Sequence, residues 1–150
     1  MRDYSFAKVK TRPFPTKADV RHPYIFGGIR SVINVAERED EEIVSLYQSL
    51  GISYHHFPTK EECEEMNWNN IKAAAKVLLD NITNDIPTIV HCIGGNNRSP
   101  MIVECAYFAL FGSHIEDEYR TQPNHLIYNS RFIGLGIQDM ERELKLLTEQ

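Results

Sequence analysis

A cysteine and an arginine lie six residues apart in the segment His91–Ser99, which reads HCIGGNNRS. A thiolate at Cys92 can act as a nucleophile, and the planar guanidinium of Arg98 can bind two oxygens of a phosphate group. Gly94 and Gly95 give the backbone the freedom to turn its N–H groups toward an anion. The segment therefore predicts a phosphate-binding loop with a nucleophilic sulfur.

A predicted strand precedes this loop and a predicted helix follows it, and together they can hold the loop in place to bind an anion. Thr88–His91 is a short apolar run that we expect to be a buried strand, and Pro100 suits the first turn of a helix that begins near Arg98. The positive end of such a helix attracts anions. The same field would favour the ionised form of Cys92.

Each residue of the loop is given a predicted role. Cys92 and Arg98 are predicted to be catalytic together with Ser99, which would donate a hydrogen bond toward the sulfur. His91 is expected to orient the loop through its ring nitrogens. The predicted phosphate-binding residues are Cys92, Ile93, Gly94, Gly95, Asn96, Asn97 and Arg98.

Apolar periodicity predicts strands that alternate with helices. The expected strands are Ile29–Ala36, Ile52–Pro58 and Thr88–His91, and the expected helices are Asp40–Leu50, Asn69–Ile82 and Met101–Phe111. Strand–helix–strand order implies right-handed crossovers and parallel pairing. We therefore expect an α/β fold: a single domain over residues 1–150 with a mostly parallel central sheet flanked by helices. Residues 1–28 are the part that the pattern defines least.

The two ends of the chain give weaker patterns. Tyr4–Val9 is expected to be an edge strand. At the other end, a short helix is expected over Glu116–Arg120 and a long one over Asn129–Leu147, where apolar residues recur at spacings of three and four. Gly134 and Gly136 weaken the start of that long helix.

Composition and charge are typical of a globular protein and not of a membrane-spanning or nucleic-acid-binding one. Apolar residues make up 42% of the chain and charged residues 25%, which is ordinary for a globular domain. No apolar run approaches the roughly 20 residues that cross a bilayer, and the N-terminus shows no secretory signal. We therefore expect a cytoplasmic protein without membrane contact. The net charge of −5 argues against a nucleic-acid partner without excluding one.

The three cysteines, Cys63, Cys92 and Cys105, have neither the number nor the spacing of a disulfide framework or a zinc site. We therefore expect a reducing compartment, no metal and no cofactor. Cys105 is expected to pack in the core. Cys63 could form a reversible disulfide with an oxidised Cys92, but we interpret it as an incidental surface cysteine.

Through the residues of this loop, the chain resembles the protein tyrosine phosphatase superfamily. The His-Cys and Arg-Ser pairs of the loop are similar to its signature, and the short length is similar to the dual-specificity branch. Val32–Arg38 and Gly51–Tyr54 look like further segments of these phosphatases. The resemblance implies a dual-specificity phosphatase-like fold and a phosphocysteine intermediate. It also implies that Asn129 steadies the phosphate loop.

Members of this superfamily normally carry an aspartate, after the second strand, that protonates the leaving oxygen. Here the position falls on Glu61, 31 residues before Cys92, in a segment that contains no aspartate. In one interpretation Glu61 or its neighbour Glu62 is the acid, because a glutamate carries the same carboxyl group. In the other there is no acid, and both glutamates are exposed charges at a helix start.

Together these features predict a metal-independent cysteine phosphatase. We expect it to hydrolyse phosphotyrosine in proteins, with phosphoserine and phosphothreonine as further candidate substrates. The loop has no lysine to meet the additional phosphates of an inositide. The alternative is an RNA 5′-triphosphatase or a nucleotide phosphoanhydride phosphatase. Members resembling such enzymes have a His-Cys-x-x-Gly-x-Asn-Arg loop, which Gly95 and Asn97 fit, and an anhydride needs no acid.

Overall fold

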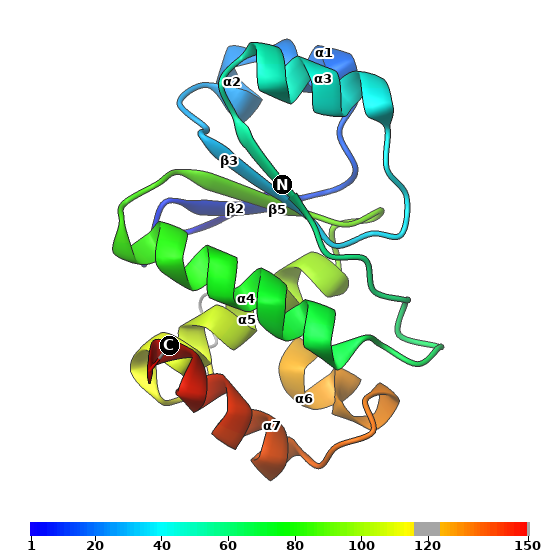
Figure 1. The fold of residues 1–150 in the computed structure, drawn as a ribbon, viewed down its shortest axis with the longest axis vertical. Helices are drawn as coiled ribbons and strands as arrows, with labels where there is room; N and C mark the ends of the chain where they lie inside the picture. Colours follow the sequence, from blue (N-terminus) through cyan, green and yellow to red (C-terminus); the bar gives the residue numbers. More distant parts are fainter. Residues whose placement is uncertain (116–123, 150) are drawn as a thin grey trace.

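In the computed structural model, which describes residues 1–115 and 124–149, five strands form one sheet in the order β1-β2-β5-β3-β4 (Figure 1). The strands are β1 (Arg2–Tyr4), β2 (Val9–Arg12), β3 (Ser31–Asn34), β4 (Ser53–His56) and β5 (Thr88–His91). Neighbouring strands from β2 to β4 are parallel, and β1 pairs antiparallel with β2. The sheet is mostly parallel, as the sequence predicts.

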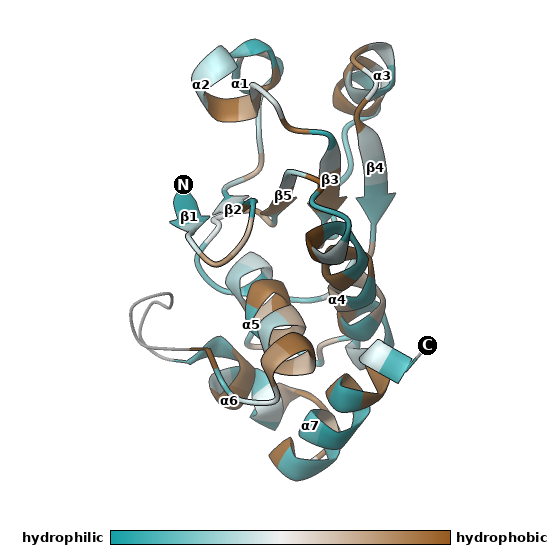
Figure 2. Cartoon of the chain, turned by 90° about the vertical axis from the view of Figure 1, so that its left-hand side faces the viewer, coloured by the Kyte–Doolittle hydropathy of each residue, from teal (hydrophilic) through white to brown (hydrophobic). Residues whose placement is uncertain are grey.

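Helices cover both faces of this sheet (Figures 1 and 2). The helices on one face are α1 (Lys17–Arg21), α2 (Pro23–Phe26) and α3 (Glu41–Ser49). The other face is covered by α4 (Trp68–Thr83) and α5 (Arg98–Phe111), with α6 (His125–Asn129) and α7 (Ile137–Lys145) beyond them. Two short 3-10 turns, Ser130–Phe132 and Leu146–Glu149, follow α6 and α7. The predicted α/β fold with flanking helices is confirmed.

Alternating side chains on the central strands divide the core into two parts. Val32 of β3 and Ile89 of β5 pack with the apolar residues of α1, α2 and α3. Their neighbours Ile33 and Val90 pack with α4 and α5 on the other face. Strands that are buried on both faces are typical of parallel sheets under helices. This burial fixes the ends of β3 and β5 and therefore the starting points of the loops that follow them.

Helix α5 lies at the centre of the molecule. It packs against α4, α6, α7 and the end of β5, and its residues from Arg98 to Ala109 are all buried. A helix that is apolar on nearly every side belongs in such a position. In the described part of the chain no helix, α5 included, is long and apolar enough to cross a membrane.

Side-chain caps set several helix boundaries. The Asp40 side chain accepts two hydrogen bonds from the first turn of α3, and the Asn67 side chain accepts one from the first turn of α4. Helix α5 ends at Gly112, which has φ 73°, a conformation that favours glycine. The predicted central helices are therefore correct to within a few residues.

The predicted edge strand over Tyr4–Val9 is wrong. The chain turns within this segment, where the Ala7 N–H donates to the Tyr4 carbonyl, and β1 and β2 lie on either side of the turn. Tyr4 and Val9 are opposite each other in the hairpin, and both side chains are buried. The apolar residues therefore mark a facing pair and not one continuous strand.

The single long helix predicted over Asn129–Leu147 is also wrong. Helix α6 ends at Asn129 and α7 begins at Ile137. Gly134 and Gly136 lie in the interruption, and glycine disfavours a helix because it loses the most backbone entropy on folding. The short helix predicted over Glu116–Arg120 lies outside the described residues.

Candidate active site

The carboxyl ends of β2, β5 and β3 meet at one edge of the sheet. Arg12, His91 and Asn34 are register partners there. Ligands of open α/β sheets bind at this edge, because the loops that follow parallel strands gather there. The phosphate loop, Cys92–Arg98, leaves β5 at this edge and enters α5. The predicted site therefore lies where the fold places ligands.

Cys92 lines a small cavity formed by this loop. The cavity has a volume of about 160 Å³ and is lined by Glu61, Glu62, Cys92, Gly94, Asn96, Asn97 and Arg98. The Gly95 N–H donates to Sγ at an N···S distance of 3.3 Å, and the Ser99 hydroxyl lies 3.4 Å from Sγ. Cys92 itself is 2% exposed. The structure thus brings Cys92, Gly95 and Ser99 together, with polar hydrogens near the sulfur.

The guanidinium of Arg98 faces the same cavity. Its Nη1 donates to the Thr59 carbonyl at 2.9 Å, and its Nη2 donates to Oε1 of Glu61 at 3.2 Å. Arg98 is only 4% exposed, and buried charges in proteins are paired. The Glu61 carboxylate therefore uses a donor of Arg98 that could otherwise bind a phosphate oxygen.

Both candidate acids reach this cavity, although their environments differ. The Glu61 side chain is 67% exposed and is held by its ion pair with Arg98. Glu62 is half-buried, and among the described residues its side chain has no hydrogen bond or ion pair. Cys63, the next residue, is exposed and free. The structure therefore brings both glutamates close to Cys92.

Gly95 cannot be replaced without moving the backbone that supports the loop. Its φ is +77°, and a Cβ atom there would lie 2.7 Å from the backbone of both Arg12 and Pro13. The Phe14 N–H donates to the Ile93 carbonyl at 2.9 Å, which holds the loop on the segment after β2. Ile93 contributes this carbonyl, while its side chain is exposed and outside the cavity lining.

His91 lies behind the loop and outside the cavity. Its Nδ1 lies 3.3 Å from the Cys92 carbonyl oxygen, and its ring packs edge-on against Phe14 at a centroid distance of 4.8 Å. Burial lowers the pKa of His91 to about 4, because a buried imidazolium loses its hydration. The ring is therefore neutral near pH 7, which suits an orienting role better than proton transfer.

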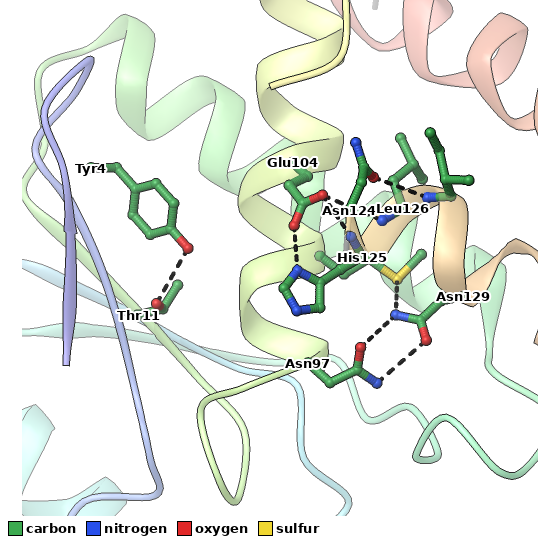
Figure 3. Close-up of polar contacts among 10 residues, drawn as sticks. Tyr4, Thr11, Asn97, Glu104, Asn124, His125, Leu126 and Asn129 are labelled. Atoms are coloured by element: carbon green, nitrogen blue, oxygen red, sulfur yellow. Dashed lines mark hydrogen bonds and ion pairs between the residues drawn. The ribbon is translucent and has the colours of Figure 1, made fainter. Parts of the chain in front are cut away.

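Asn129 reaches the loop from α6 (Figure 3). Its Nδ2 donates to Oδ1 of Asn97 at 2.8 Å, and Nδ2 of Asn97 donates back to its Oδ1 at 3.3 Å. The same Nδ2 of Asn129 lies 3.4 Å from the Met101 sulfur. This reciprocal pair of amides ties the end of the phosphate loop to α6, where the resemblance placed a supporting asparagine.

Residues near the ends of neighbouring strands support the loop, and these were not predicted from the sequence. Arg12 and Pro13 back Gly95, and Thr59 supplies the carbonyl that holds Arg98. No pattern in the sequence marks them, because Arg12 ends a strand that is recognised only through its pairing with β5. By contrast, Cys105 has no role here. It is fully buried, and desolvation raises the pKa of its thiol, so it is an inert core residue as predicted.

The family model that matches this chain covers residues 26–118 and describes Cyclin-dependent kinase inhibitor 3 (CDKN3). The matched segment contains both glutamates, the whole phosphate loop and all of α5. No curated protein sequence matches the chain.

Solved structures of phosphatases share the fold. PTPMT1 is 15% identical, with a TM-score of 0.66 over 94% of each chain. The PP-IP phosphatase SIW14 from S. cerevisiae is 12% identical, with a TM-score of 0.59 over 93% of this chain and 80% of its own. Kinase associated phosphatase (KAP) is 19% identical, with a TM-score of 0.56 over 94% and 85%. With the family match and the cavity around Cys92, the chain belongs to the CDKN3 family, among the cysteine-based phosphatases of the protein tyrosine phosphatase superfamily.

Proposed function

We propose that this phosphatase hydrolyses phosphotyrosine in proteins, and also phosphoserine and phosphothreonine, through a phosphocysteine on Cys92. One observation carries the proposal: the buried sulfur of Cys92 and the buried guanidinium of Arg98 line one cavity of about 160 Å³. A nucleophile and a bidentate cation that face the same space can bind a phosphoryl group and attack it.

The proposed reaction has two steps. The Cys92 thiolate attacks phosphorus, an S–P bond forms, and the bond from phosphorus to the substrate oxygen breaks with its electrons on that oxygen. Water then attacks phosphorus, and the S–P bond breaks to return the thiolate and release phosphate. Arg98 and the N–H groups of the loop stabilise the charge on the phosphoryl oxygens, and Ser99 stabilises the departing sulfur.

We propose that Glu61 protonates the leaving oxygen and then accepts the proton from water, with Glu62 as the other candidate. Neighbouring negative charge favours the protonated form of a carboxyl group. A phosphate that displaces Glu61 from Arg98 would therefore also prepare this carboxyl group to donate a proton. The 3.2 Å contact between Glu61 and Arg98 supports this role, because it places the carboxylate beside the guanidinium.

The charges around the cavity support a substrate with a single phosphate monoester. The lining contains one cation, Arg98, and two carboxylates, Glu61 and Glu62. Further phosphates on a ligand would meet the glutamates without a second cation to bind them. PTPMT1 has been solved with PI(5)P, and SIW14 is a PP-IP phosphatase, so similar folds serve such ligands in those proteins. For this chain the charges favour a phosphoprotein, and KAP is a phosphatase named for its association with a kinase.

One observation favours the second candidate, a phosphatase of RNA 5′-triphosphates or nucleotide anhydrides. Glu61 is already committed to Arg98, and an anhydride leaves without a proton from an acid. The excess of negative charge on the chain opposes an RNA partner. We therefore rank this activity second.

We also propose a cytoplasmic location and a single phosphatase domain over residues 1–150. The three cysteines are free, and the reaction needs Cys92 in its reduced form. The apolar core on one face of the sheet joins β1 near one end of the chain to α7 near the other, which supports one domain.

The test of the mechanism is hydrolysis of an aryl phosphate in the presence of a chelator. Cys92→Ser should lower turnover by at least about a thousandfold while phosphate still binds. Arg98→Lys should lower kcat/KM by about a hundredfold and weaken phosphate binding, because lysine cannot bind two oxygens in one plane. Cys105→Ala and Arg30→Lys are the matched controls and should keep full turnover. Equal turnover in Cys92→Ser and the wild type would reject the mechanism.

The test of the substrate class compares kcat/KM on three compounds under one set of conditions: a phosphotyrosine peptide, a phosphoinositide and a triphosphate-ended RNA. We expect the peptide to be the best substrate. Faster release of phosphate from the RNA would replace the proposal with the second candidate, and faster release from the phosphoinositide would contradict both.

A further inference from the structure

Helix α5 carries a carboxylate in the middle of its buried surface. Glu104 is 2% exposed, and its neighbours Val103 and Cys105 are fully buried. An apolar side chain would pack here without loss of hydration, whereas a carboxylate is tolerated only with hydrogen-bond donors around it. The donors that surround Glu104 therefore indicate what it does.

Among the residues that the structure describes, these donors come from the start of α6 (Figure 3). Oε1 of Glu104 accepts from the backbone N–H of His125 at 2.9 Å and, more weakly, from that of Leu126 at 3.4 Å. Oε2 lies 2.6 Å from Nδ1 of His125, within hydrogen-bond distance. Glu104 thus fixes the first turn of α6 to the middle of α5.

Helix α6 needs such anchors. It has five residues, far fewer than the roughly 12 that form a helix alone in water. Its last residue, Asn129, is fully buried and holds Asn97 of the phosphate loop. The helix is therefore a short bridge, with Glu104 at one end and the loop at the other.

We propose that Glu104 is a positioning residue for the phosphate loop. By holding the start of α6, it sets the position of Asn129, and Asn129 keeps Asn97 and the loop in the shape that binds phosphate. This inference rests on the proposed function, because it concerns the same site. Replacing Glu104 alone leaves buried donors of His125 and Leu126 without their acceptor, which lowers stability, so the test must measure the loop itself and not the melting temperature alone.

The test is a double-mutant cycle on the binding of inorganic phosphate, followed through the amide NMR signal of Gly95. Glu104→Leu and Asn129→Ala should each weaken binding by about tenfold, which corresponds to the loss of one good hydrogen bond. The double variant should also lose about tenfold, because both substitutions break the same chain of contacts. Glu104→Gln keeps an acceptor for the backbone N–H groups and should restore most of the affinity.

The matched control is Ile102→Ala, which opens a cavity on another face of the same helix and should lower the melting temperature without changing phosphate affinity. If Glu104→Leu does not fold, Glu104→Met replaces it. Unchanged affinity in either apolar variant, or a hundredfold loss in the double variant, would overturn the proposal. Failure of the wild-type protein to bind phosphate would instead contradict the proposed function.

Discussion

The phosphate loop and the acid segment, Lys60–Glu65, face the same cavity but are held in different ways. Buried neighbours fix the loop at Gly95, at Asn97 and at Arg98. The acid segment is anchored at its ends, where the Thr59 N–H donates to the Val35 carbonyl and the Met66 N–H donates to the Phe132 carbonyl. Between these ends its side chains are mostly exposed.

This difference separates two parts of the chemistry. The loop binds the phosphoryl group, which every phosphate ester has, and its geometry tolerates little change. In the proposed mechanism the acid segment meets the leaving group, which varies between substrates. An exposed segment can accept a glutamate where relatives carry an aspartate, because few packed neighbours restrict the extra methylene.

The largest effect on turnover should come from replacing Gly95, where the neighbouring backbone leaves no room for a Cβ atom. Gly95→Ala should lower kcat/KM by at least about a thousandfold, because the new methyl group would displace the loop from the backbone of Arg12 and Pro13. In Gly134→Ala no atom would lie within 4 Å of the new Cβ, and the residue is outside the cavity lining, so this control should stay within about fivefold of the wild type. Kinetics on an aryl phosphate would measure both. Similar losses in the two variants would mean that the loop is not held as described.

A smaller effect, confined to some substrates, is expected in the acid segment. Glu61→Gln should slow aryl phosphates with poor leaving groups by about a hundredfold and leave activated ones almost unchanged. Glu62→Gln is the matched control, one residue away. The reverse result would assign the acid to Glu62, and no effect from either variant would favour the anhydride substrates.

A change of about tenfold is expected at the hydroxyl beside the sulfur. Ser99→Ala removes the group 3.4 Å from Sγ and should slow the second step, because the departing thiolate loses a hydrogen bond. Rapid-mixing kinetics should then show a burst of the phenol product whose amplitude equals the enzyme concentration. A uniform fall in rate without a burst would place Ser99 in the first step.

A separate effect is expected on stability and not on turnover. Because burial lowers the pKa of His91 from 6.5 to about 4, the unfolded chain takes up a proton there before the folded chain does. His91 should therefore lower the unfolding free energy by about 2 kcal/mol as pH falls from 7 to 5. Urea unfolding at both pH values should show a flatter profile for His91→Gln. His55, whose pKa is lowered by partial burial, is the control, and His55→Gln should flatten the profile less.

The sequence predicts the centre of this molecule well and its periphery poorly. Central strands such as Thr88–His91 are apolar on both faces, and the loop between β5 and α5 has a specific pattern of residue types, so both are recognisable. The hairpin of β1 and β2 is not, because β2 is four residues long and depends on pairing with β5, which is remote in the chain. The support from Arg12 and Thr59 was missed for the same reason, since it becomes visible only when the strands are placed side by side.

The ion pair between Glu61 and Arg98 gives the buried guanidinium a counter-ion from the protein itself. A guanidinium this deeply buried would be costly to leave unpaired, and the carboxylate prevents that when no ligand is bound. At the end of each turnover the same carboxylate can compete with inorganic phosphate for Arg98. In the proposed mechanism, product release would then be an exchange of one anion for another at Arg98, with the glutamate of the same site replacing the phosphate.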